Sequence, residues 1–168
     1  NKYFDRLNGF DMTKLRALNR KFNGTYLWCG PEGRARYNRM VEVDNKAYIT
    51  NTEGFRYRML YKISDDYQRT NNSWDLVDLY SRNPLDFIKV DRKTMIDTCR
   101  KMNNDQLKAF IIFKKYERKK IGAMMAEMII NKELKDKEEG QIVNKTMPTL
   151  DIVTLNAIRD VLREESCE

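Results

Sequence analysis

The chain has 168 residues, which is enough for one domain and too few for two ordinary ones. Its composition, 41% hydrophobic and 34% charged, is typical of a protein that folds in water, and its net charge of +7 favours a polyanionic partner. The sequence contains no histidine, which excludes Ser-His-Asp and Cys-His nucleophiles and histidine-ligated zinc. We expect a cytoplasmic protein without a cofactor, membrane span or signal peptide, because the three cysteines are far apart and no long apolar run occurs.

The N-terminal half predicts one helix followed by strands. Asp11 or Thr13 can cap a helix over residues 12–22, whose apolar side chains recur with helical spacing, and Gly24 can end it. Short strands follow over residues 26–29, 37–43, 47–51 and 55–63, the second and third joined as a hairpin at Asp44-Asn45. The last strand has the clearest alternation, with one predicted buried face made of Phe55, Tyr57, Met59, Tyr61 and Ile63.

The C-terminal half predicts a second mixture of strands and helices. Residues 64–72 are predicted as a loop, and residues 74–80 as either a strand or a helical turn. A strand over 85–90 leads through Asp91, a good cap, to a helix over 92–102. The remaining predicted elements are a hairpin of 107–113 with 119–130, a loop or frayed helix over 131–140, a short strand at 142–143 and a last amphipathic helix over 151–165.

The order of these elements predicts an α+β fold. The two basic helices begin about 80 residues apart, and hairpin strands follow each, so the chain reads as two βαββ-type halves. Each half alone would expose a hydrophobic sheet face, which the other half can cover. We therefore expect one domain with antiparallel sheets over residues 1–148 and a C-terminal helical extension over residues 149–168.

Basic side chains lie opposite the apolar stripe on both of these predicted helices. The first helix carries Lys14, Arg16, Arg20 and Lys21, and the second carries Lys93, Arg100 and Lys101. Two such faces on one wall would follow a phosphate backbone, where affinity comes from the release of condensed counterions. The alternative is that both are the solvated faces of a lysine-rich protein.

Arginines and aromatic residues are also mixed along the predicted strands. Arg34, Arg36, Arg39, Arg56 and Arg58 stand among Tyr37, Phe55, Tyr57 and Tyr61, a mixture that can stack bases and hold phosphates. A sheet with one solvated face and an aromatic core also explains this mixture, and we prefer that explanation. Gly30-Pro31-Glu32-Gly33 matches a G-x-x-G loop in form only, because its inner pair lacks basic side chains, so we predict a tight turn.

Three pairs of carboxylates are the candidates for a magnesium site. They are Asp65 with Asp66, Asp75 with Asp78, and Glu138 with Glu139. Each pair lies in or beside a predicted loop, where solvated acids are the simpler explanation. The sequence therefore predicts no catalytic residue and no metal ligand.

Residues 87–102 resemble the strand-to-helix step of a bacterial sliding clamp domain, the DNA polymerase processivity factor. A strand ending at Val90 leads to the pair Arg92-Lys93 and an amphipathic helix that ends in basic residues. Residues 40–56 are similar to the hairpin of the same family, and the resemblance covers about residues 11–130. It implies a clamp-like domain whose two helices face DNA, with the seven basic residues above as the DNA-facing set. A ring would require six copies of this chain.

These observations give three hypotheses. The first is a non-enzymatic replication accessory that contacts the backbone of double-stranded DNA through basic helices, alone or as a homo-oligomer. The alternative is a small viral or mobile-element protein that binds and modulates a host replication or transcription enzyme through residues 151–165 or the apolar residues 74–80. The third is a metal-dependent nuclease that uses Asp65, Asp66, Asp75 or Asp78.

Overall fold

The computed structural model describes residues 10–138, and the regular elements in that range are all helices or helical turns. The elements in chain order are α2 (Met12–Asn23), α3 (Gly33–Thr50), α4 (Thr52–Ile63), α5 (Asp65–Thr70), α6 (Leu76–Arg82), two 3-10 turns η1 (Asp86–Lys89) and η2 (Arg92–Thr94), α7 (Asp97–Arg100) and α8 (Asn104–Glu138). Within this part of the chain, strand-type pairing is limited to one isolated antiparallel bridge between Trp28 and Asp75. The predicted α+β fold of two βαββ-type halves with antiparallel sheets is therefore wrong.

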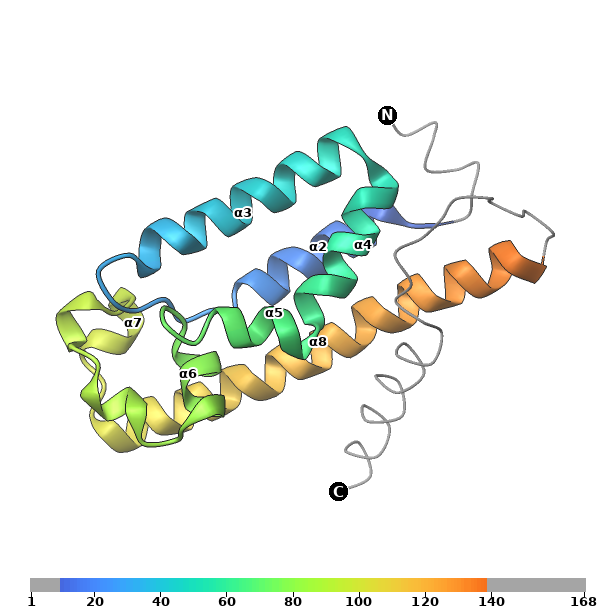
Figure 1. The fold of residues 1–168 in the computed structure, drawn as a ribbon. Helices are drawn as coiled ribbons and strands as arrows, with labels where there is room; N and C mark the ends of the chain where they lie inside the picture. The colour runs from blue at the N-terminus through green and yellow to red at the C-terminus, as the bar shows by residue number, and fades with distance from the viewer. Residues whose placement is uncertain (1–9, 139–168) are drawn as a thin grey trace, which may run out of the picture.

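The long helix α8 is the element along which the others are arranged (Figure 1). Helices α2 and α4 pack against it, α3 packs against α4, and α6 contacts the N-terminal part of α8. None of the described helices combines the length and the apolar character that crossing a membrane requires.

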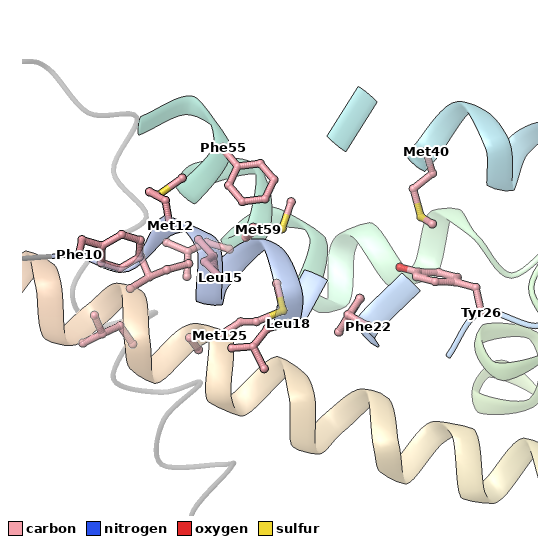
Figure 2. Close-up of a cluster of buried hydrophobic side chains, with 14 of the residues drawn as sticks. Phe10, Met12, Leu15, Leu18, Phe22, Tyr26, Met40, Phe55, Met59 and Met125 are labelled. Atoms are coloured by element: carbon pink, nitrogen blue, oxygen red, sulfur yellow. The ribbon is translucent and has the colours of Figure 1, made fainter. Parts of the chain in front are cut away.

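Two hydrophobic clusters lie along α8. The first joins α2, α4 and the C-terminal half of α8 (Figure 2), and its fully buried members include Leu15, Phe22, Phe55, Met59, Met125 and Ile129. The second joins α6, the segment of residues 86–102 and the N-terminal part of α8, with Leu76, Phe87, Met95, Cys99, Leu107 and Ile111 buried. Each cluster is closed by one face of α8, whose inner side is buried between Leu107 and Ile130.

The predicted first helix is confirmed. The Asp11 side chain accepts a hydrogen bond from the Lys14 backbone N–H at 2.8 Å, which caps α2 at its first turn. The Gly24 backbone N–H donates to the carbonyl of Arg20 at 3.1 Å, where the helix ends.

The predicted hairpin over residues 37–51 is wrong, because residues 33–50 form the single helix α3. Between residues 34 and 50 the chain contains neither glycine nor proline, so nothing interrupts a helix there. Asp44, which we expected in a turn, is buried within α3. Its carboxylate accepts hydrogen bonds from Lys62 and Arg58 and is therefore occupied by tertiary partners instead of local turn contacts.

The predicted strand over residues 55–63 is also wrong, because these residues belong to α4. Phe55, Met59 and Ile63 are four residues apart, so they share a face in a helix as well as in a strand. The Asn51 side chain caps this helix by accepting the Gly54 N–H at 3.0 Å. Tyr61, which a strand would bury, is 47% exposed.

The predicted helix over residues 92–102 does not form as one helix. Its first residues make η2, whose cap Asp91 accepts the Lys93 N–H at 2.9 Å, and its last residues make the short α7. Between these elements the Ile96 N–H donates to the carbonyl of Trp28 at 3.0 Å, so a tertiary hydrogen bond replaces a helical one. The strand predicted over 85–90 is replaced by η1.

The predicted hairpin of residues 107–113 with 119–130 is wrong, because both segments belong to the single helix α8. The charged residues between these two apolar runs contain Arg118, whose side chain is buried against α6 instead of facing water in a connection.

The predictions for the remaining segments have mixed outcomes. The predicted loop 64–72 contains α5, and the residues that allowed either a strand or a helical turn contain α6. Residues 131–140 allowed either a loop or a frayed helix, and helix α8 continues through most of them to Glu138. The strand at 142–143 and the helix over 151–165 lie outside the described residues.

Gly122 lies where α8 packs closely on α2 and α4 and gives a test of this packing. A Cβ atom there would lie 3.4 Å from Phe22 Cε2 and 3.5 Å from Ile63 Cγ2. We expect Gly122→Ala to change the free energy of unfolding by less than about 1 kcal/mol, since its helix propensity offsets the tight contact. Gly122→Leu should lower that free energy by about 2 kcal/mol through overpacking.

The measurement is urea unfolding followed by circular dichroism at the helix band. Ala35→Leu, at an exposed position of α3, is the control and should leave stability nearly unchanged. A Gly122→Leu protein as stable as the wild type would show that α8 does not pack this closely.

Candidate functional site

Three of the predicted basic residues form an exposed surface on α2. Lys14, Arg20 and Lys21 are exposed, on the side of the helix away from its buried apolar residues. Among the described α-helices, α2 alone has no acidic residue within its bounds. None of the three side chains forms a salt bridge with another described residue, so their charges face solvent.

Arg16, the fourth predicted residue of this helix, has a different environment. Its guanidinium carbon lies 4.2 Å from the centre of the Tyr48 ring, and the residue is half-buried between α2 and α3. This cation–π contact makes Arg16 a packing residue, and the exposed set on α2 is reduced to three.

The second predicted basic set does not lie on a helix beside the first. Lys93 belongs to η2 and Lys101 follows α7, and both are exposed. Arg100 donates to the Met95 carbonyl at 2.8 Å and pairs with Asp97 at 3.1 Å. The predicted basic surface made by two helices is therefore wrong, because residues 92–102 do not form a single helix.

The arginines expected among aromatic residues are also dispersed. Arg34, Arg36 and Arg39 are exposed on α3, where Arg36 pairs with Glu32 at 3.0 Å. Arg58 is bound inside the protein to Asp44, and Phe55 belongs to the core. The Gly30–Gly33 segment is a turn, as predicted, and Gly30 has the positive φ of 80° that favours glycine.

The carboxylates considered for a magnesium site are occupied or scattered. Asp75 and Asp78 are buried, and both accept hydrogen bonds from Arg118, at 2.9 and 2.8 Å. Asp65 and Asp66 are exposed on the short helix α5. Among residues 10–138 there is no group of three or more acidic or cysteine side chains that could hold a metal ion.

Arg118 is the centre of a buried ion cluster that sequence reasoning missed. In addition to the two carboxylates, its Nε donates to Thr25 Oγ1 at 2.9 Å and its second terminal nitrogen donates to the Thr25 carbonyl at 3.0 Å. The guanidinium carbon lies 4.0 Å from the centre of the Tyr26 ring. One side chain of α8 thus holds both α6 and the loop that follows α2.

Asp78 has an unusual protonation equilibrium within this cluster. Its burial raises the pKa of the carboxyl to about 7, a shift that Arg118 opposes and Asp75 reinforces. The pKa of Arg118 is raised above its ordinary value, because the two carboxylates outweigh the effect of burial. A single guanidinium therefore serves two carboxylates, and the pKa of Asp78 stays raised because Arg118 only partly offsets its burial.

A second buried ion cluster surrounds Lys62 of α4. Its ammonium group donates to Asp44 Oδ2 at 2.5 Å, to Asn19 Oδ1 at 3.0 Å and to Asn23 Oδ1, which uses all three of its N–H groups. Arg58 Nε donates to the other oxygen of Asp44 at 2.7 Å.

Burial shifts the two members of this ion pair differently. It lowers the pKa of Lys62 to about 8, against the opposing effect of Asp44. Burial alone would raise the pKa of Asp44, but Lys62, Asn23 and Arg58 outweigh it and hold that pKa below its usual value.

Neither cluster presents a reactive group. The Lys62 ammonium is fully buried and has no free N–H group with which to meet a substrate. The clusters contain the cations Arg58, Lys62 and Arg118 and the anions Asp44, Asp75 and Asp78, so their formal charges balance. Their chemistry is that of internal ion pairs that join helices.

The sequence contains one feature from which the Lys62 cluster could have been predicted. Asn19 and Asn23 are four residues apart on α2 and lie beside apolar residues that face the core. Amides at such positions require buried hydrogen-bonding partners. For Arg118, the charged sequence around it gave no comparable signal, because five of the seven residues 114–120 are lysine or arginine.

Comparison with protein families, with curated proteins and with solved structures finds no match to this chain.

Removal of the Arg118 charge should be strongly destabilising. In Arg118→Met, Asp75 and Asp78 remain buried without a cation, and we expect the free energy of unfolding to fall by about 3–5 kcal/mol. Lys120→Met, which removes an exposed charge from the same helix, should change it by less than about 0.5 kcal/mol. Chemical denaturation of the two variants measures the difference, and equal stabilities would contradict a structural role for Arg118.

The raised pKa of Asp78 predicts a specific pH dependence. Between about pH 4 and pH 7 the folded protein keeps a proton on Asp78 that the unfolded chain releases, so this residue makes stability decrease as pH rises. The slope from this group is roughly 1 kcal/mol per pH unit. Denaturation of wild type and Asp78→Asn at several pH values isolates this contribution.

The amide in Asp78→Asn cannot ionise, so the variant should lose stability less steeply than the wild type over this pH interval. Parallel curves for the two proteins would show that Asp78 titrates at its ordinary pKa.

Proposed function

We propose that this chain is a non-enzymatic protein that binds the backbone of double-stranded DNA, without reading bases, through the exposed basic face of α2. The observation that carries this proposal is the set Lys14, Arg20 and Lys21, three exposed cations on a helix without an acidic residue. The helix rises about 10 Å from Lys14 to Lys21. One DNA strand presents a phosphate about every 3.4 Å, so all three cations can meet phosphates at once.

Helix stability does not account for this charge arrangement. Arg20 and Lys21 lie in the last turn of α2, where cations interact favourably with the helix dipole. Lys14, however, lies in the first turn, where a positive charge opposes the dipole. A phosphate partner gives a reason for a cation at both ends of the helix.

The proposal includes a cytoplasmic role as an accessory to DNA replication. Cys29 and Cys99 support a reducing compartment, because both are buried free thiols. Of the resemblance to sliding clamps, the proposal keeps only the contact with the DNA backbone. The clamp fold itself is not proposed, because the described residues form no sheet. Lys93 and Lys101 are exposed and join the proposal as secondary contacts.

Residues 74–80 offer no exposed apolar surface through which the chain could dock on a replication or transcription enzyme. Trp74, Leu76 and Val77 are all buried in the two hydrophobic clusters. The other docking element, residues 151–165, lies outside the described residues.

Charge reversal on α2 tests the proposal. The variant Lys14→Glu/Arg20→Glu/Lys21→Glu should bind a fluorescently labelled 20-base-pair duplex at least tenfold more weakly in about 50 mM salt. Because each lost phosphate contact reduces the salt dependence, the slope of log K against log salt should fall by about 3. Fluorescence anisotropy over a salt series measures both quantities.

A matched variant separates the site from net charge. Arg34→Glu/Arg39→Glu/Lys46→Glu reverses three exposed charges on α3 and changes the net charge by the same amount. We expect it to keep most of the affinity and most of the salt slope. Equal losses in the two variants would show that binding follows overall charge and would reject α2 as the interface.

A further inference from the structure

Helix α8 has a second apolar face that nothing in the described part of the chain covers. We call it the outer stripe, and it consists of Ile112, Phe113, Tyr116 and Met124. At 100° per residue these side chains fall within about 120° of one another, on the side of the helix opposite Ile111 and Met125 of the core. Phe113 is 53% exposed and Tyr116 is 67% exposed. Large side chains grouped in this way mark a contact surface.

The surroundings of the outer stripe are basic. Lys115 and Lys120 are exposed on the same stretch of α8 as Tyr116, and Glu127 is an exposed acid on this side of the helix beyond Met124. A partner for this face must therefore combine apolar side chains with negative charge.

Residues 149–168, the acidic tail, have this combination in their sequence. They contain five acidic residues and two arginines, a net charge of −3 in a chain whose total is +7. Ile152, Leu155, Ile158 and Leu162 recur at the spacing of one helix face. The tail is thus the apolar and acidic partner that the outer stripe requires.

The length of the chain allows the tail to reach this face. Residues 139–150 can span about 40 Å when extended, and Met124 is only about 21 Å back along α8 from Glu138. An antiparallel register that places Ile152 beside Met124 puts Cys167 level with Ala109 along α8, because fifteen residues separate each pair, with Cys167 on the flank of a helical tail. The tail then covers the entire outer stripe.

We propose that the acidic tail of this chain folds back as a helix and docks on the outer stripe of α8. This contact is separate from the proposed DNA interface on α2. The tether raises the effective concentration of the tail far above that of a free partner. A second copy of the chain is disfavoured, since pairing two outer stripes would bring their lysines together. A single-stranded nucleic acid would stack on Phe113 and Tyr116 but gains little from Ile112 and Met124.

Chemical cross-linking tests the contact and its direction. In the full-length Ala109→Cys variant, a bismaleimide that reaches across one helix, about 10 Å, should join the new thiol to Cys167 within one chain. The rate should be at least tenfold higher than in Ala17→Cys, which introduces an exposed thiol on α2. Cys29 and Cys99 are buried, and burial raises the pKa of Cys29 to about 12, so neither competes. The products are separated by denaturing electrophoresis and identified by peptide mass.

Two tail variants connect the cross-link to the apolar face of the tail. Leu155→Asp/Ile158→Asp, made in the Ala109→Cys protein, should abolish the link. Val153→Asp/Ala157→Asp adds the same two negative charges on the opposite side of a helical tail and should retain it. Equal rates at Ala109→Cys and Ala17→Cys, or a link between two chains in place of one within a chain, would overturn the proposal.

A second measurement does not depend on the register. In a Tyr116→Cys/Cys167→Ser protein, maleimide labelling should be at least tenfold slower with the intact tail than with Leu155→Asp/Ile158→Asp. Equal labelling rates would overturn the proposal. Protection that appears only after a single-stranded oligonucleotide is added would also overturn it and would assign the outer stripe to nucleic acid.

Discussion

The contact on which this structure depends most is that of Arg118 with Asp75 and Asp78. The guanidinium comes from the middle of the longest helix, the carboxylates from the start of α6, and the backbone carbonyl of Thr25 from the loop after α2. Asp75 also caps α6 and accepts the Leu27 N–H at 2.7 Å, so the same carboxylate fixes the start of a helix and the path of a loop. The two hydrophobic clusters meet at this point, and a single charged residue joins their elements.

Tyr26 connects this cluster to the one around Lys62. Its ring centre lies 4.0 Å from the guanidinium carbon of Arg118 and 5.9 Å from the Lys62 ammonium, and the ring stacks on Trp74. Two cations and an aromatic core are thereby brought into one buried region with their counter-ions. Ion pairs of this kind join specific helices, because each of these charges meets its counter-ion only when α3, α4, α6 and α8 are arranged as they are here.

The charges of the protein are consequently divided between two roles. Internal cations such as Arg58, Lys62 and Arg118 are bound to carboxylates and hold helices together. The cations of α2 face solvent, and on them the proposed backbone contact depends. In the described part of the chain, the buried cations and anions nearly cancel. The excess positive charge of these residues therefore lies at the surface. The outer stripe of α8 adds an exposed apolar surface, on which the proposed contact of the acidic tail depends.

The sequence by itself determined the helix α2 with both of its ends, the turn at Gly30–Gly33 and the exposure of Lys14, Arg20 and Lys21, because these depend on capping residues and local periodicity. The tertiary structure decided that residues 33–63 form helices, since Phe55, Met59 and Ile63 fit either period and the partners of Asp44 come from α2 and α4. It also decided the place of Arg118, because one charged residue among many becomes a core residue only when distant carboxylates meet it.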